Sequence, residues 1–186
     1  MMSAPINISL PLSTENQRKL RAGDRVLLTG VMFTARDAAH KKMAEALKAG
    51  GSLPISIEGQ TLYYVGPTPA KPGYPVGTAG PTTSERMDDY TPLLLEQGLR
   101  GMIGKGHRSD GVVQAIKKHN AIYFAATGGA GALLAKSILE MEPVAYVDLG
   151  PEAIHSVKVK DFPVIVINDS EGNDWYQQIK DNHAKM

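Results

Sequence analysis

The chain has 186 residues, of which 42% are hydrophobic and 21% are charged, and its formal net charge at pH 7 is +1. This length suits one domain with a full core, so we predict a single domain over residues 1–186. The small net charge gives no reason to expect a nucleic-acid or membrane partner, and no apolar run approaches the roughly 20 residues that span a bilayer. The N-terminus lacks a basic start and a small-residue cleavage site, so we expect a cytoplasmic protein.

Cysteine is absent from the sequence. This excludes disulfides, thiol catalysis and any iron–sulfur or zinc–thiolate centre built by this chain alone. Five histidines remain, but none forms a closely spaced pair of the kind that binds a catalytic metal. We therefore expect no metal site made by this chain alone.

The first part of the chain begins with two predicted strands and a helix. Residues 5–12 alternate apolar and polar side chains, which predicts an edge strand because a proline is tolerated there. Residues 25–30 predict a brief strand that ends in a glycine turn. Thr34 has the character of an N-cap for a helix over 35–49, which two glycines end.

The middle of the chain predicts a hairpin followed by a long loop. Residues 55–57 and 61–65 are predicted strands, and the turn residues at 58–60 favour a hairpin between them. Residues 66–80 contain four prolines and four glycines, which predicts an extended loop. A loop of this length in a compact domain is usually functional or mobile.

The second half alternates strand and helix patterns, which is typical of a parallel sheet. A strand-rich first half and this alternation together predict an α/β fold in a single mixed domain. The predicted helices cover 85–97, 109–119, 131–141 and the polar tail from 174. The predicted strands cover 99–103, 121–125, 144–147, 154–159 and 164–167.

Three predicted helix starts carry cations. Arg36 follows Thr34, Arg86 lies in the first turn of its helix, and Lys105 and Arg108 precede a third helix. A helix start has unpaired N–H groups and a partial positive charge, so an exposed arginine there costs about 0.3–1 kcal/mol. Three such placements beside glycine or threonine suggest a bound anion. Two or more cations suit a small dicarboxylate, because each guanidinium can form a fork of hydrogen bonds to one carboxylate.

Each of these residues also has an ordinary structural interpretation. Arg36 alone fits an ion pair with Asp37 or another neighbouring carboxylate. Arg86 fits a solvated network with the acidic residues around it. The turn Thr127–Gly131 offers backbone N–H donors to an anion, but close strand–helix packing also needs glycine. His40 fits a structural histidine better than a catalyst, so the patterns alone predict only an anion-binding α/β domain.

Longer motifs around these residues point to a family. They are Thr34–Lys41, Gly80–Asp88, Gly104–Gly106, Asp148–Ile154 and Asp161–Pro163, in this order. Together they closely resemble the iron–sulfur hydro-lyases of the class I fumarase and tartrate dehydratase group. The resemblance is to the β subunit, equivalent to the C-terminal domain of the single-chain enzymes, and it extends over nearly the whole chain. It implies a domain of the swivelling β/β/α type.

The resemblance implies a lyase that reversibly hydrates fumarate to L-malate, or one that dehydrates tartrate. It also implies a 4Fe-4S cluster held by cysteines of an α subunit, no cofactor or metal ligand on this chain, and an α2β2 assembly. A sequence without cysteine agrees with a separate β chain. The motifs at 148–154 and 172–175 resemble the fumarase branch more closely, so fumarate is the expected substrate. An L-tartrate dehydratase β subunit and a non-catalytic dicarboxylate-binding module stay open as alternatives.

The resemblance also implies roles for individual residues. Arg36, Arg86 and Lys105 are the implied ligands of substrate carboxylates. Thr82 is implied to exchange the proton on the carbon next to a carboxylate, and its hydroxyl needs an activating neighbour because a free hydroxyl is a poor base. Four neighbours are expected to support these residues from behind: Asp37, His40, Thr83 and Arg108.

Overall fold

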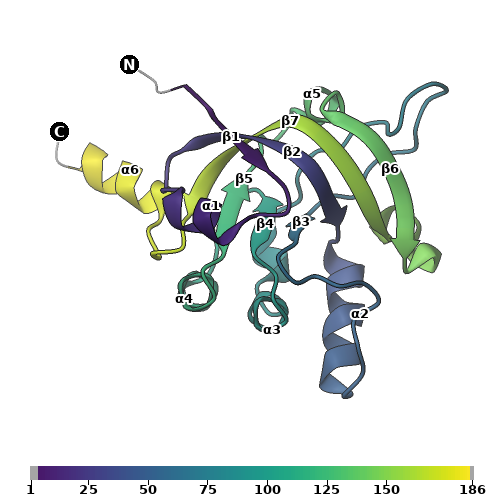
Figure 1. Ribbon diagram of the computed structural model, residues 1–186, viewed down its shortest axis with the longest axis horizontal. Coiled ribbons are helices and arrows are strands. Elements are labelled where there is room, and N and C mark those ends of the chain that lie inside the picture. Colours follow the sequence, from purple (N-terminus) through teal and green to yellow (C-terminus); the bar gives the residue numbers. More distant parts are fainter. Residues whose placement is uncertain (1–3, 185–186) are drawn as a thin grey trace.

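The computed structural model describes residues 4–184 and contains a seven-stranded sheet that closes on itself like a barrel (Figure 1). The strand order is β1-β2-β3-β4-β5-β7-β6, and an additional pairing of β2 with β7 closes the ring. Strands β1 to β5 pair in parallel, whereas β7 runs antiparallel to β2, β5 and β6. The strands are β1 Ile6–Ser9, β2 Arg25–Thr34, β3 Thr61–Tyr63, β4 Gly101–Gly104, β5 Ile122–Ala125, β6 Ile138–Ala145 and β7 Ile154–Asn168. The predicted mixed α/β fold is confirmed.

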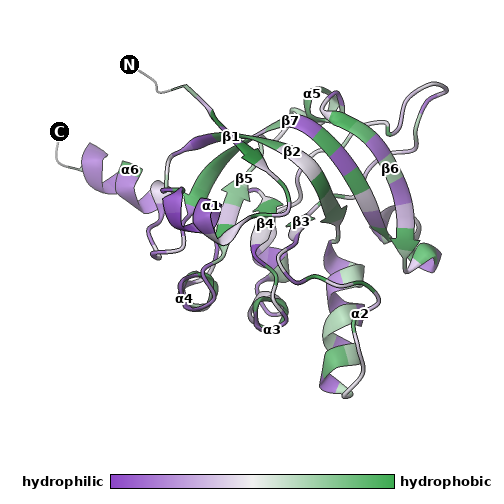
Figure 2. Ribbon diagram, in the orientation of Figure 1, coloured by the Kyte–Doolittle hydropathy of each residue, from purple (hydrophilic) through white to green (hydrophobic). Residues whose placement is uncertain are grey.

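Helices α2, α3 and α4 lie together on the side of the parallel strands away from β6 (Figure 1). Helix α6 follows the end of β7 and points away from the sheet (Figure 1). It is mostly hydrophilic, as its sequence predicts (Figure 2). The Asp174 side chain caps α6 by accepting the Gln177 N–H at 3.1 Å. The helices are α1 Thr14–Lys19, α2 Asp37–Lys48, α3 Thr91–Glu96, α4 Asp110–Lys118, α5 Gly131–Ala135 and α6 Trp175–His183, with 3₁₀ helices η1 Ser84–Met87 and η2 Val147–Glu152.

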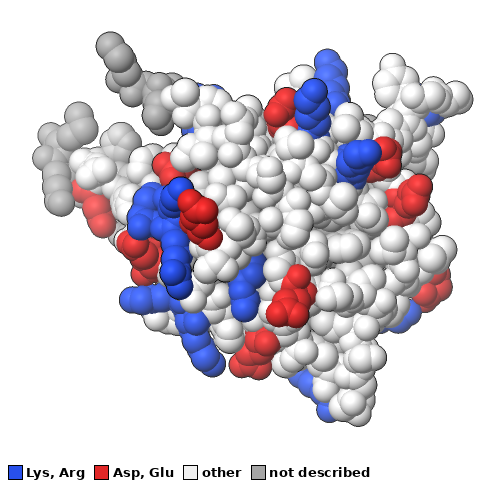
Figure 3. All heavy atoms as spheres, in the orientation of Figure 1, with Lys and Arg blue, Asp and Glu red and all other residues white. Residues whose placement is uncertain are grey.

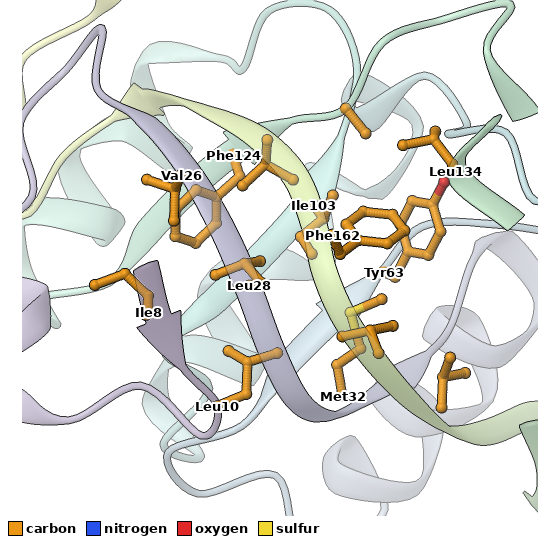
Figure 4. Packing of buried hydrophobic residues seen from close by; sticks show 14 of the residues in the cluster. Ile8, Leu10, Val26, Leu28, Met32, Tyr63, Ile103, Phe124, Leu134 and Phe162 are labelled. Carbon is orange, nitrogen blue, oxygen red and sulfur yellow. The ribbon is translucent and has the colours of Figure 1, made fainter. Parts of the chain in front are cut away.

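Two apolar clusters form the core. The first fills the barrel, where Phe162 of β7 meets the edge of Tyr63 at a ring-centroid distance of 5.2 Å (Figure 4). The second lies between the parallel strands and α2, α3 and α4, and includes Met43, Leu94 and Ile116. Each fully buried side chain of this size contributes about 1.5–3 kcal/mol relative to exposure. The core therefore fixes the strands from both sides.

Gly30 does not end a strand, contrary to the sequence-based expectation. Strand β2 is ten residues long and continues through Gly30. Its pairing with β7 shifts register between Leu28 and Gly30. Gly30 has φ 134°, and a Cβ on it would lie 2.6 Å from the Leu10 carbonyl oxygen. The glycine is therefore needed at a β-bulge where another backbone approaches closely.

The predicted hairpin at 58–60 is wrong. Residues 55–57 form no strand, and β3 pairs in parallel with both β2 and β4. Residues 58–60 do form a turn, closed by Gln60 N–H to Ile57 carbonyl at 3.0 Å. Short apolar runs separated by a turn look alike in a hairpin and in a parallel sheet, so the pattern could not separate them.

Two predicted helices are shorter than expected. The helix predicted over 85–97 is divided into η1 and α3, and Pro92 lies in the first turn of α3, where its missing N–H costs nothing. The helix predicted over 131–141 ends at Ala135, because residues from Ile138 onward pair with β7. The two strands predicted over 154–167 are one strand, β7, in which Asp161 has φ 52°.

Between residues 4 and 184, no helix combines the length and apolar character needed to cross a bilayer. On the face drawn in Figure 3, charged residues lie in small groups of both signs.

Candidate functional site

The carboxyl ends of the parallel strands β2 to β5 meet at one edge of the sheet. Adjacent strands pair in register up to their last residues, so they end side by side. Arg36 follows the end of β2, Lys105 directly follows β4, and the turn Thr127–Gly131 follows β5. This edge is where open α/β sheets commonly bind ligands. Three segments that are distant in sequence therefore contribute to one candidate site.

Thr82 and Lys105 are joined through their backbones. The Thr82 N–H donates to the Tyr64 carbonyl at 2.7 Å, and the Lys105 N–H donates to the Thr82 carbonyl at 3.3 Å. The Lys105 side chain extends toward the glycine turn, since its Cδ lies 3.4 Å from where a Cβ would stand on Gly128. Within residues 4–184, no hydrogen bond engages the Thr82 hydroxyl and no ion pair engages the Lys105 ammonium. Both groups are available to a ligand.

Arg36 is the N-cap residue of α2 and lies against the backbone of Gly66. Its Nη2 is 3.2 Å from Glu152 Oε1, and its side chain is 28% exposed. Glu152 also accepts the Ala38 N–H through Oε2 at 2.7 Å. The ion pair expected on ordinary structural grounds exists, but with Glu152 of η2 rather than with Asp37. The Arg36 Nε is buried and has no partner in the described part of the chain.

Arg86 pairs with Asp37, with Nε 2.8 Å from Oδ1. The acidic residues next to Arg86 in sequence are not its partners, so the predicted local network is not what forms. Its side chain is 56% exposed, and its two terminal nitrogens have no partner among residues 4–184. Arg86 thereby reaches the start of α2, beside Arg36, and keeps donors for an anion.

Arg108 is buried and holds the segment that follows Arg86. Its Nε donates to Asp88 Oδ1 at 2.7 Å, its Nη2 to Thr91 at 2.6 Å, and its guanidinium lies 5.0 Å from the centre of the Tyr123 ring. The side chain is fully inaccessible to solvent in this ion pair. Arg108 is therefore held by the protein interior, and its supporting role at the site stays a prediction.

His40 is also buried. Its Nδ1 donates to the Arg36 carbonyl at 3.0 Å, and its ring meets the Tyr64 ring edge-on at a centroid distance of 5.0 Å. Burial lowers the pKa of His40 to about 4, so the imidazole is neutral at pH 7. Thr83 is the N-cap residue of η1 without a side-chain capping bond, and its backbone bridges to Lys105.

Thr34 does not cap α2, contrary to the sequence-based expectation. It is the last residue of β2, and its hydroxyl accepts the His155 N–H at 3.0 Å. The helix begins at Asp37, and the Glu152 carboxylate occupies the capping position at its first turn. Sequence reasoning missed the roles of Glu152 and Gly66, although Glu152 lies inside the motif Asp148–Ile154.

The candidate site lies outside the hollows that the loop 66–80 lines. Two hollows of the described surface, of about 560 and 340 Å³, are lined by residues of the loop 66–80, and neither is lined by Thr82 or the three cations. Among residues 4–184, no group of three or more metal-ligating side chains is arranged to hold a metal ion, and the chain has no cysteine. The donor set of an iron–sulfur cluster is therefore not supplied by the described part of this chain.

Comparison with known proteins identifies relatives along nearly the whole sequence. The family model for the fumarase C-terminus matches residues 2–179. The anaerobic class I fumarate hydratase of Escherichia coli is 45% identical over 157 residues, which are 83% of this chain and 29% of that protein. Fumarate hydratase 2 of Leishmania major is 37% identical over 180 residues, which are 95% of this chain and 32% of that protein.

A shorter relative matches this chain over most of the length of both proteins. The provisionally named L(+)-tartrate dehydratase subunit beta of Methanocaldococcus jannaschii is 36% identical over 174 residues, which are 90% of this chain and 89% of that protein. The chain thus spans about a third of the fumarate hydratases but most of the tartrate dehydratase subunit. The resemblance inferred from the motifs is confirmed: the chain belongs to the fumarase C-terminus family.

Proposed function

We propose that this chain is the β subunit of a hydro-lyase that reversibly hydrates fumarate to L-malate together with an α subunit. The observation that supports this most strongly is the backbone pairing of Thr82 with Lys105 at the edge where Arg36 also lies. The pairing brings an unengaged hydroxyl and an unengaged ammonium to one place. A hydroxyl beside several cations suits proton transfer next to a carboxylate.

The cations bind the two carboxylates of the substrate. Arg86 offers its two terminal nitrogens, Lys105 its ammonium, and Arg36 the donors that Glu152 leaves free. A guanidinium binds a carboxylate through two parallel hydrogen bonds, whereas an ammonium acts as a point charge. This set suits a short dicarboxylate, because each end of the substrate meets fixed positive charge.

The same cations assist the chemistry at Thr82. In the dehydration of malate, the C–H bond next to one carboxylate breaks and its electron pair forms the double bond. The C–O bond at the adjacent carbon then breaks, and the hydroxyl leaves as hydroxide with the electron pair of that bond. Negative charge builds on the carboxylate oxygens as the proton moves to the Thr82 oxygen, and fixed cations stabilise that charge. To accept this proton, the Thr82 hydroxyl must first give its own proton to a base, which we assign to the α subunit. We assign the stabilisation of a charged Thr82 oxygen to Lys105, whose backbone N–H donates a hydrogen bond to the Thr82 carbonyl.

In this proposal, the α subunit binds the hydroxyl group of malate. This chain spans about a third of the fumarate hydratases it matches. The 4Fe-4S cluster that the family resemblance implies would need cysteine ligands, and this chain has none. We therefore assign the cluster to the α subunit.

L-tartrate is the second candidate substrate. This chain matches most of the length of the Methanocaldococcus jannaschii relative, which is named as an L(+)-tartrate dehydratase subunit. Tartrate differs from malate by one hydroxyl, so the same cations would bind it. A non-catalytic dicarboxylate-binding module is a third candidate, although such a module has no evident need for the free hydroxyl of Thr82.

The proposal is tested by anaerobic reconstitution of this chain with its α subunit and an iron–sulfur cluster. We expect the assembly to hydrate fumarate and to dehydrate malate, and to dehydrate tartrate at a lower rate. We expect no activity of this chain alone. Faster turnover of tartrate than of malate would assign the second candidate. Dicarboxylate binding without turnover of any of the three compounds would assign the binding module.

A further inference from the structure

Glu152 contacts Arg36 and the start of α2 at the same time. Its Oε1 pairs with Arg36 Nη2 at 3.2 Å, and its Oε2 accepts the Ala38 N–H at 2.7 Å. The first turn of a helix favours a carboxylate, because its N–H groups are unpaired and the helix dipole is positive there. The two side chains are 28% and 25% exposed, so the ion pair is partly shielded from water. Glu152 therefore fixes one side of the guanidinium to a rigid element.

Gly66 limits the guanidinium on another side. A Cβ on Gly66 would lie 2.4 Å from Arg36 Cζ and 2.6 Å from Nε, which is closer than real atoms approach. Gly66 is not among the residues with positive φ, so its backbone suits alanine as well as glycine. An added methyl group would therefore displace the Arg36 side chain and leave the chain path intact.

We propose that Glu152 and Gly66 are positioning residues, which hold Arg36 in the orientation that binds a substrate carboxylate. The inference rests on the proposed function for the role of Arg36. Arginine has four rotatable side-chain bonds, and ordering them on binding weakens affinity. Because Glu152 and Gly66 order the guanidinium beforehand, that cost is not added when the substrate binds. Glu152 itself acts through Arg36 and does not touch the substrate.

The test compares Glu152→Ala, Glu152→Gln and Gly66→Ala. In the purified chain, the Nε–H signal of Arg36 in a ¹H–¹⁵N spectrum reports on its orientation, and Arg36→Lys identifies that signal by its loss. We expect Glu152→Ala and Gly66→Ala to shift or broaden the signal. Glu152→Gln keeps an acceptor for Ala38 and should change it less.

In the enzyme assembled with the α subunit, the same variants separate binding from chemistry. We expect Glu152→Ala and Gly66→Ala to raise KM for fumarate by about tenfold with a smaller change in kcat, because a ground-state contact is weakened. Glu152→Gln should recover most of the affinity. Matched controls are Glu140→Ala, which removes an exposed carboxylate paired with Lys158, and Gly111→Ala, which adds a methyl group in open space.

An unchanged Arg36 signal and an unchanged KM in both Glu152→Ala and Gly66→Ala would overturn the inference. A lower Tm with the signal and KM unchanged would overturn it as well, since that is the result of a purely structural role. If Glu152→Ala does not fold, Gly66→Ala decides. If the unaltered assembly does not hydrate fumarate, the proposed function fails, and the Arg36 signal still decides whether these residues position the guanidinium.

Discussion

Arg86 Nε lies 2.8 Å from Asp37 Oδ1, and this ion pair joins η1 to the start of α2. Asp37 occupies only the Nε side of the guanidinium, so both terminal nitrogens stay free within residues 4–184. A carboxylate can bind these two nitrogens end-on through parallel hydrogen bonds. The ion pair therefore orients Arg86 without consuming the donors that a substrate needs.

The first prediction concerns the geometry of that guanidinium. Arg86→Lys keeps the charge but loses the planar pair of donors, so KM for malate in the assembled enzyme should rise by about tenfold or more. Arg86→Ala should raise it further. Arg21→Ala is the matched control, because it removes a surface arginine that pairs with Glu171 far from the site. Equal kinetic constants for Arg86→Ala and the unaltered enzyme would remove Arg86 from the site.

The second prediction concerns proton transfer at Thr82. Thr82→Val replaces the hydroxyl by a methyl group of similar size, so kcat should fall by about 100-fold or more while KM changes little. Exchange of the malate C–H proton with deuterium from solvent should slow in parallel, because it reports the same transfer. Thr14→Val, an exposed threonine of α1, is the control and should leave both rates unchanged. Continued exchange at the normal rate in Thr82→Val would show that another group moves the proton.

The sequence predicts which cations form the candidate site, but it does not predict the acidic residues that pair with them. Arg36, Arg86 and Lys105 stand in recognisable motifs close to the ends of predicted elements. Their contacts to Glu152 and Asp37 depend on where η2 and α2 meet, which is a property of the folded chain. Local pattern favours local pairing, so the alternative interpretation of Arg86 was a network with neighbouring acids, and that network does not form.

The fold class was predictable from local sequence patterns, whereas the pairing of the strands in the sheet was not. Alternating strands and helices in the second half follow from hydrophobic period, and β4, α4 and β5 lie near their predicted positions. The bulge at Gly30 and the long strand through Asp161 are stabilised by pairing between β2 and β7, which are far apart in sequence. A short apolar run does not indicate which other strand will pair with it.

The third prediction concerns the buried ion pair behind the site. Arg108 is fully buried against Asp88, and removing one partner leaves the other charge unpaired. Arg108→Ala should therefore lower the free energy of unfolding of the chain by about 3–5 kcal/mol, measured by urea denaturation. Lys158→Ala breaks an exposed pair with Glu140 and should cost less than about 1 kcal/mol. Similar losses in the two variants would contradict the structural role of Arg108.

The last prediction concerns the pH dependence of stability. Burial lowers the pKa of His40 to about 4, whereas the unfolded chain binds a proton there below about pH 6.5. Between these values the unfolded state holds more protons, so stability falls as the pH decreases from 6.5 to 4, by about 3 kcal/mol in all. His40→Gln removes this titration. Between pH 7 and pH 5, the unaltered chain should lose about 2 kcal/mol more unfolding free energy than His40→Gln, measured by urea denaturation. The other histidines titrate in both proteins and cancel in the comparison, so parallel pH profiles would show that His40 is not buried as a neutral imidazole.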